Sequence, residues 1–381
     1  GLVWDLPGLE GLVWEWASPF NLEWGVLGLR GFFLLDEAAT PAALALFLAH
    51  LPSLAVGVLL PFLALRERLP GWMSMLGAVL LAAIVYPVAG NWFSGGGWLM
   101  HVGQTLGLGH GYVDLTGTST AALVGSLAAL LGIVIFRRRL PPLPEGEVAM
   151  LPVVHLPVLA ILGAFLAAVG SVSLFAANPI LAGGGLAHPR VGVNLLLAAA
   201  GGAILPGLYT WFTTGAADSL VAARGCVAGV IAATAAASLI PPWAALALGG
   251  AAGLLVPLVT FVVRYVLRID DPTGALPIGL PAGVLGILAP GLVADGQAGQ
   301  GWNGIGVESY LGVAGQGITG FVPAPGLASD WPGQINAQLV GMAAIAAWTA
   351  AAVAILFLIL KVLLVLWRFV PVPEEEDDLE P

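Results

Sequence analysis

A histidine inside an apolar run is the first residue of this chain that could do chemistry. His50 lies in the stretch 41–65, which contains no other ionisable side chain. Such a residue in a membrane helix is a functional candidate, because burying it is costly. Its imidazole could accept or pass on a proton. The alternative is a neutral ring bonded to a neighbouring backbone carbonyl.

A carboxylate precedes another apolar stretch, 116–136. Asp114 could cap the free N–H groups at the start of a helix and complement its dipole, or it could attract a cation. Asp270 and Asp271 precede the stretch 274–294 in the same way, so the capping interpretation applies there too. Hydroxyl side chains that could line a polar passage, or bond to backbone and neighbouring helices, follow Asp114. They are Thr116, Thr118, Ser119 and Thr120.

Other chemistries find little support in the residues. The remaining histidines are His101, His110, His155 and His188. There is no His-x-x-x-His motif and no carboxylate cluster, so we expect no metal site and no cofactor. A nucleophile with a matching base is also missing, which argues against an enzyme. The single Cys226 excludes a disulfide framework and is expected to be an inert buried thiol.

The composition places these residues in a membrane protein. Of 381 residues, 59% are hydrophobic and 9% are charged, against about 25% charged in ordinary globular chains. The apolar runs reach the roughly 20 residues that a helix needs to cross a bilayer. The net charge of -10 argues against a nucleic-acid partner, because such proteins are basic. We therefore expect an all-α integral membrane protein in contact with the lipid bilayer.

About nine transmembrane helices are expected, separated by segments rich in Gly, Pro and charge. Their approximate ranges are 41–65, 71–92, 116–136, 151–176, 191–212, 219–239, 243–267, 274–294 and 337–368. Cytoplasmic loops are enriched in Lys and Arg. With the N-terminus outside and the C-terminus in the cytoplasm, 10 of the 12 basic residues fall on the cytoplasmic side. The helix count and this orientation support each other.

Three regions are expected along the chain. Segment 1–40 has four Trp and no spanning run, so we expect it along the outer membrane surface. The transmembrane domain covers 41–370 and includes a long, Gly-rich external loop, 296–335. An acidic cytoplasmic tail follows at 371–381. The last helix is expected to exceed the bilayer thickness, since about 32 residues span roughly 48 Å.

Two segments resemble signature stretches of the ammonium transporter/Rhesus (Amt/Rh) family. They are 114–139 (DLTGTSTAALVGSLAALLGIVIFRRR) and 270–286 (DDPTGALPIGLPAGVLG). Weaker similarities run in the family's order and spacing over residues 25–378, including 86–99 (YPVAGNWFSGGGWL) and 268–274 (RIDDPTG). No single motif is decisive, but their order and spacing together are specific.

The resemblance implies a fold and a partner. Members of the family have eleven helices, of which the first five and the second five form an inverted repeat. Such repeats normally place the pathway at their interface. This chain is expected to lack the first two helices, which leaves one half of the repeat incomplete. The resemblance also implies a homotrimer, or a subunit of a larger membrane complex, in the cell membrane.

The resemblance further implies a set of pore positions. In the family, an outer aromatic vestibule holds the cation, two Phe form a gate, and two His line an apolar lumen. The vestibule positions are Trp92 and Phe93, near Asp114. The gate positions are Ser53 and, within about a residue, Leu174. The histidine positions are Ala122 and Gly279. Because neither gate rings nor histidines stand at these positions, the family's proton-handling chemistry cannot run on them.

Two functional hypotheses remain open from the sequence. One is an Amt-like channel or transporter with a degenerate pore, which passes ammonium, ammonia or another small neutral solute by an altered mechanism. The other is a non-conducting Amt-like scaffold or accessory subunit. An ammonium sensor is a weaker third. A transporter needs a continuous polar or narrow lumen, whereas a scaffold predicts a lumen plugged by Leu and Ala side chains or by lipid.

Overall fold

Long apolar helices make up most of the chain. The computed structural model describes residues 13–17, 23–28, 40–137, 155–271 and 273–368. The long helices are α1 (Pro41–Leu65), α5 (Thr118–Ile135), α6 (His155–Ala177), α8 (Pro189–Thr214), α10 (Pro242–Phe261), α11 (Ala275–Val293) and α12 (Gly333–Arg368). Helix α9 (Ser219–Thr234) has 16 residues. The shorter ones are α2 (Gly71–Leu80), α3 (Tyr86–Ser94), α4 (Trp98–Leu106) and α7 (Pro179–Gly183), with π-helical turns η3 (Leu81–Val85) and η4 (Val262–Val266).

The membrane-spanning pattern is close to the expected one. In the described ranges, eight helical segments are long and apolar enough to cross a bilayer. One of them, Gly71–Leu106, combines α2, η3, α3 and α4 and so runs further than the expected 71–92. The expected span 219–239 is represented by the shorter α9.

Buried polar contacts explain why α9 stops early. Residues 235–239 form tight turns instead of a helix. The Nδ2 of Asn194 donates to the carbonyls of Ala237 (2.7 Å) and Ile240 (2.8 Å), which satisfies two backbone groups without a helix. Pro241 and Pro242 follow and begin α10. The expected continuous helix to residue 239 was therefore wrong in its end, not in its existence.

Capping side chains fix the starts of several helices. Thr40 accepts from the Ala43 N–H (3.2 Å) at α1. Asp218 accepts from two N–H groups at α9. Asp271 accepts from Leu276 N (2.8 Å) at α11, as the capping interpretation predicted. Asp270, in contrast, pairs with Arg68.

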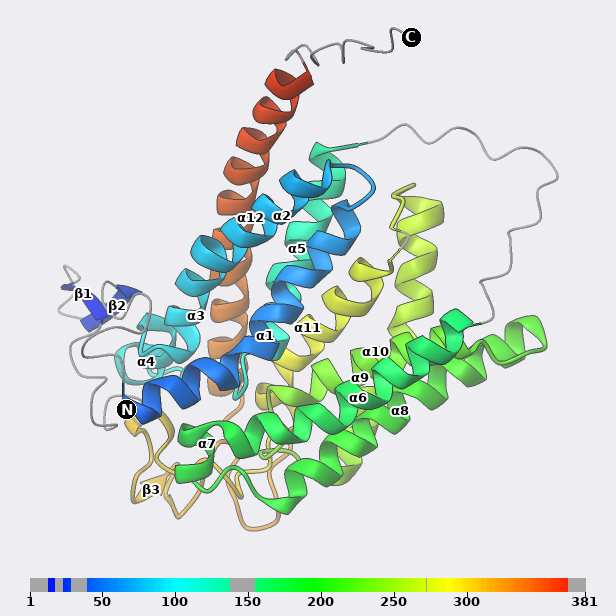
Figure 1. Cartoon of the computed structure of the whole chain (residues 1–381). Coiled ribbons are helices and arrows are strands. Elements are labelled where there is room, and N and C mark those ends of the chain that lie inside the picture. The colour runs from blue at the N-terminus through cyan, green and yellow to red at the C-terminus, as the bar shows by residue number, and fades with distance from the viewer. Residues whose placement is uncertain (1–12, 18–22, 29–39, 138–154, 272, 369–381) are drawn as a thin grey trace, which may run out of the picture.

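The helix α5 lies in the middle of the bundle and contacts α1, α9, α11 and α12. A second group, α8, α9 and α10, packs side by side (Figure 1), and glycines lie at its helix contacts. An ideal Cβ at Gly253 would lie 2.2 Å from the carbonyl oxygen of Gly202, so only glycine permits this approach.

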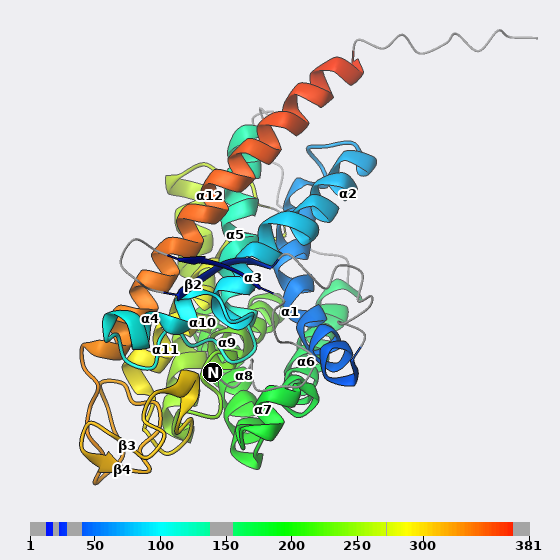
Figure 2. The ribbon, with the colours of Figure 1, turned by 90° about the vertical axis from the view of Figure 1, so that its left-hand side faces the viewer.

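Two elements extend beyond the bundle. A hairpin of β1 (Val13–Ala17) and β2 (Glu23–Gly28) lies against α3 and α4 and was not predicted from sequence. The rest of segment 1–40 lies outside the described residues, except Thr40. Helix α12 has 36 residues and projects past the other helices, as Figure 2 shows. The long final helix is thus confirmed, while the tail 371–381 lies outside the described residues.

The loops between helices fall at two ends of the bundle. The α1–α2 and α10–α11 connections lie at the end where α12 finishes (Figure 1). The segment between α11 and α12, with η5 (Trp302–Gly304), β3 (Ser309–Tyr310) and β4 (Val313–Ala314), lies at the opposite end. This alternation agrees with a multi-pass chain, and we call the two ends the α12-terminal end and the loop end.

Candidate functional site

The core between α5 and α11 contains both positions that the resemblance gives to pore histidines. Ala122 on α5 is fully buried. It lies in an apolar cluster with alanines and branched side chains of α9, α10 and α11, and Val56 of α1 packs against this cluster. Nothing in this cluster can take up or release a proton.

Gly279 faces α5 and α1 at close range. An ideal Cβ on it would lie 2.2 Å from the Oγ of Ser126, 2.7 Å from a methyl of Leu60 and 3.4 Å from the Ala122 carbonyl oxygen. A histidine at this position would need both side chains to move. The space beside Gly279 is therefore filled by Ser126 and Leu60.

Two further glycines continue this contact along α11. An ideal Cβ at Gly283 would lie 2.8 Å from the backbone N of Leu123 and 2.9 Å from the carbonyl oxygen of Ser119. At Gly286 it would lie 2.2 Å from the Oγ of Ser119. The glycines are spaced by four and three residues, so they share one helix face. We call this contact the glycine–serine seam of α5 and α11.

The serines of the seam differ in their hydrogen bonding. Ser119 donates to the carbonyl of Ile231 (2.8 Å). Ser126 Oγ is buried and has no hydrogen-bond partner among the described residues. Sequence reasoning missed Ser126 as a site residue. The sequence feature that could have indicated Ser126 is its position four residues after Ala122, which places both on the same face of α5.

A buried hydroxyl cluster lies at the start of α5. Ser53, the expected first gate position, donates to the Thr116 carbonyl (2.8 Å) and contacts the Thr118 hydroxyl (2.9 Å). Thr116 also donates to Thr118 through its side chain (2.9 Å). Three hydroxyls from α1 and the α5 entrance thus satisfy one another.

Asp114 closes this cluster as a cap. Its carboxylate accepts from Gly117 N (2.9 Å), Thr120 N (2.8 Å) and the Thr120 hydroxyl (2.8 Å). Burial raises the pKa of Asp114, and the bonds from Thr120 and Gly117 oppose that rise. The capping arrangement proposed from sequence is present, and the carboxylate is not exposed to solvent.

Of the expected vestibule aromatics, Phe93 is buried and Trp92 is partly buried. Phe93 is buried, and an ideal Cβ on Gly117 would lie 2.7 Å from its ring. Trp92 donates through Nε1 to the carbonyl of Val26 (2.8 Å) and packs against Trp98 and Trp348. Their assignment as a cation vestibule stays a prediction.

Two more expected positions lie on α6 and α1. Leu174 is half-buried, whereas its neighbour Phe175 is fully buried beside the apolar segment that precedes α5. His50 forms a 2.8 Å contact between Nδ1 and the Leu46 carbonyl, which is the backbone contact given as the alternative to a functional histidine. In the described residues, no group of three His, Cys, Asp or Glu side chains could hold a metal ion.

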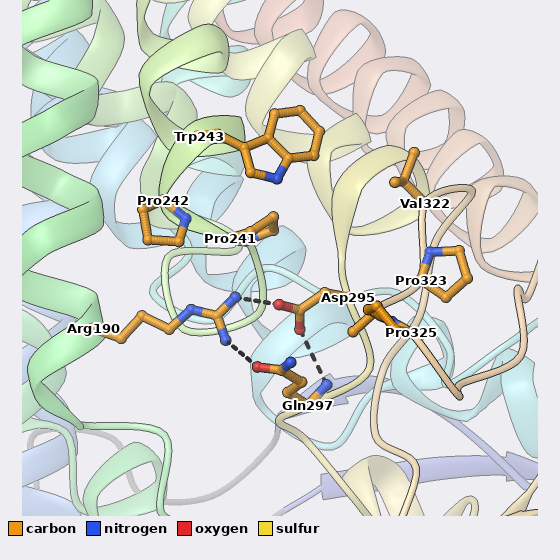
Figure 3. Close-up of a pocket in the computed structure, with 10 residues that line it drawn as sticks. Arg190, Pro241, Pro242, Trp243, Asp295, Gln297, Val322, Pro323 and Pro325 are labelled. Carbon is orange, nitrogen blue, oxygen red and sulfur yellow. Dashed lines mark hydrogen bonds and ion pairs between the residues drawn. The ribbon is translucent and has the colours of Figure 1, made fainter.

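A cavity of about 450 Å³ lies at the loop end, between α8, α10 and the segment before α12 (Figure 3). Its polar part is an ion pair between Arg190 and Asp295, and Arg190 also donates to Gln297 (3.2 Å). Proline rings and Trp243 form the other walls (Figure 3). Sequence reasoning did not find this cavity. Its charges already neutralise each other, so we assign no ligand to it.

Comparison with known proteins identifies the family of this chain. The sequence model of the Ammonium Transporter Family matches residues 17–380. The chain belongs to the ammonium transporter family. It is accordingly a multi-pass protein of the cell membrane.

Individual relatives agree with this assignment. The chain is 28% identical over 289 residues to "Ammonium transporter Amt2" of Archaeoglobus fulgidus, covering 74% of this chain and 61% of the relative. It is 30% identical over 270 residues to "Ammonium transporter Amt2" of Haloferax mediterranei, covering 68% and 57%. The matches thus span about three fifths of the relatives' length.

Solved structures share the fold. A protein described as "Sensor Amt Protein" aligns with a TM-score of 0.70 at 21% identity, covering 94% of this chain and 81% of that one. Mep2 of Candida albicans aligns with a TM-score of 0.63 at 22% identity, covering 80% and 61%. At these identities the similarity establishes the fold alone.

Proposed function

We propose that this member of the ammonium transporter family does not conduct ammonium through its core and acts as a membrane scaffold or an accessory subunit. The observation that carries the proposal is the glycine–serine seam, which brings Gly279 into contact with Ser126 and Leu60. A lumen plugged by Leu and Ala side chains is what a scaffold predicts. Ala122 and Leu60 fit that description.

The energetics favour the same conclusion. A cation that entered this core would lose its hydration, and the core offers no aromatic or imidazole group to bind it. This transfer costs several kcal/mol or more. Neutral ammonia would need α5 and α11 to separate at Gly283, where an added Cβ would already touch backbone atoms. A homotrimer or a larger assembly remains part of the proposal, with lipid or a partner against the bundle's apolar outer face.

A second candidate is conduction by an altered mechanism, and the hydroxyl cluster favours it. Ser53, Thr116 and Thr118 place three hydroxyls at the start of α5, beside Asp114. They could form the entrance of a polar path. Relatives named as ammonium transporters give this candidate its solute, ammonium or ammonia.

A flux assay on purified protein in liposomes separates the two candidates. Internal pH is followed by stopped flow after an ammonium jump, with empty liposomes and liposomes containing the Archaeoglobus relative as references. The scaffold proposal expects the rate of empty liposomes. A rate clearly above that reference, removed by Ser53→Ala, would instead establish conduction through the hydroxyl cluster.

A further inference from the structure

Two adjoining cavities lie at the α12-terminal end of the bundle. One has a volume of about 400 Å³ and the other about 590 Å³. They share Arg68, Val134 and Arg137. The first also has Arg268 and Asp270 in its wall, and the second has Glu67 and Lys361. Each lining therefore holds three basic side chains against one acidic side chain, in a chain whose net charge is -10. We call the pair the arginine cavity.

Arg68 is the fixed part of this cavity. Its side chain is only 5% exposed. One terminal nitrogen donates to the Ala64 carbonyl (2.9 Å), and the other donates to the Asp270 carbonyl (2.5 Å) and pairs with the Asp270 carboxylate (3.8 Å). Its Nε is buried and has no partner among the described residues. A buried donor without an acceptor costs free energy, so a ligand oxygen there would be stabilising.

Two more arginines remain available for a ligand. Arg137 and Arg268 are exposed, and neither forms an ion pair with another side chain in the described part of the chain. Arg268 has a φ of +53°, a conformation that a side chain of its size rarely adopts. Such local strain persists where surrounding structure imposes it, often at ligand sites.

The remaining wall is apolar. Ile133, Val134 and Leu267 line the smaller cavity, and Leu364 and Val365 line the larger. These residues belong to the ends of membrane helices or follow them directly. A ligand that fits must therefore combine an anionic group with an apolar body at the membrane surface.

We propose that the arginine cavity binds the phosphate group of an anionic phospholipid. Guanidinium groups match phosphate oxygens through paired hydrogen bonds. Basic pockets between membrane helices are suited to anionic headgroups, and the expected orientation places this end at the cytoplasmic leaflet. The apolar wall then contacts the first part of the acyl chains.

Native mass spectrometry of the full chain in a neutral detergent tests this proposal. The probes are dioctanoyl phosphatidylglycerol, dioctanoyl phosphatidylcholine and inorganic phosphate, each titrated alone. The variant is Arg137→Gln/Arg268→Gln, which changes only exposed side chains and leaves the buried Arg68 in place. The matched control is Arg264→Gln, which removes an exposed arginine near the same end that lines neither cavity.

We expect phosphatidylglycerol to bind more tightly than phosphatidylcholine. The double variant should lower the affinity for phosphatidylglycerol about 25-fold, or about fivefold for each arginine. Arg264→Gln should leave this affinity nearly unchanged. Inorganic phosphate that binds as tightly as the lipid would support the phosphate site but assign it to a soluble ion. Equal binding of both lipids, or equal losses in the double variant and the control, would overturn the proposal.

Discussion

At the scale of single residues, the seam depends on the absence of side chains. Gly279, Gly283 and Gly286 leave room for Ser126, Leu123 and Ser119 of the facing helix. Packing of this kind lets two backbones approach closely, and it supplies van der Waals contact where the hydrophobic effect cannot. On the proposed function, Gly279 therefore stands where the resemblance implies a pore histidine and also lets Ser126 and Leu60 fill the space beside it.

Gly283→Ala should destabilise the protein by about 1–3 kcal/mol, because its Cβ would overlap backbone atoms of α5. Thermal unfolding in detergent measures this as a lower midpoint. Gly163→Ala on α6 is the matched control, since a Cβ there meets nothing within 4 Å, and it should be neutral or slightly stabilising. Equal midpoints for both variants would mean that α5 and α11 are not in contact.

A pH-dependent contribution is expected at the loop end. Burial raises the pKa of Asp330 to about 6, while Tyr310 donates to its carboxylate (2.9 Å). His110 contacts the Tyr310 ring, and burial lowers the pKa of this histidine to about 4. As pH rises from about 4 to about 6, the contribution of Asp330 to the free energy of unfolding falls, because its pKa is raised in the fold. The contribution of His110 rises over the same range, because its pKa is lowered, so the two changes partly cancel.

Asp330→Asn removes the first contribution and keeps an acceptor for Tyr310. Relative to the unchanged protein, its unfolding midpoint should therefore rise steadily between pH 4 and pH 6.5 and level off above. Midpoints measured at half-unit steps give this difference directly. A difference that does not change with pH would show that Asp330 titrates normally.

At the scale of elements, the sequence predicts helices better than their interruptions. Long apolar runs and Pro or Asp at their starts indicated α1, α5, α8, α10 and α11 correctly. The end of α9 depends on Asn194, which is distant in sequence, and periodicity cannot report such a contact. The β1–β2 hairpin was missed for a related reason, since Trp-rich sequence suits both an interfacial segment and a strand.

Contacts between the residues of the site were harder to predict than the positions of those residues in the sequence. Asp114 as a cap followed from its place before a helix, and the position of Ala122 and Gly279 followed from the resemblance. That Ser126 fills the space beside Gly279 depends on the separation of two helices, which no local pattern contains.

The hairpin should loosen when its bond to the bundle is removed. Trp92→Phe keeps an aromatic ring near Trp98 and Trp348 but loses the bond to Val26, which is worth about 0.5–1.5 kcal/mol. Hydrogen exchange in 23–28 should therefore accelerate while exchange in α5 stays the same. Unchanged exchange in the hairpin would mean that this bond does not hold it.

At the scale of the whole molecule, the chain combines the fold of its family with the closed core that we propose. Loops alternate between two ends, and the expected orientation puts the α12-terminal end in the cytoplasm. That arrangement places the arginine cavity at the inner leaflet and the Arg190–Asp295 pair outside. Function would then lie at the surfaces of the bundle and not along its axis.

The orientation has a direct test in intact cells, in a Cys226→Ala background. A membrane-impermeant thiol reagent should label Ala182→Cys, in the α7 region expected outside. It should not label Ala216→Cys, in the connection between α8 and α9. Both positions are exposed, so the reverse labelling pattern would invert the orientation.

The closed core is tested most directly by a cysteine placed in the seam. Ser126→Cys in the Cys226→Ala background, purified in lipid nanodiscs, is treated with 2-aminoethyl methanethiosulfonate, a small reagent that itself carries an ammonium group. Ala216→Cys reports full access, and unfolded protein reports the intrinsic reactivity of each thiol. We predict that Ser126→Cys stays unmodified while Ala216→Cys reacts to completion. Modification of both at similar rates would contradict the closed core and would favour the second candidate, conduction by an altered mechanism.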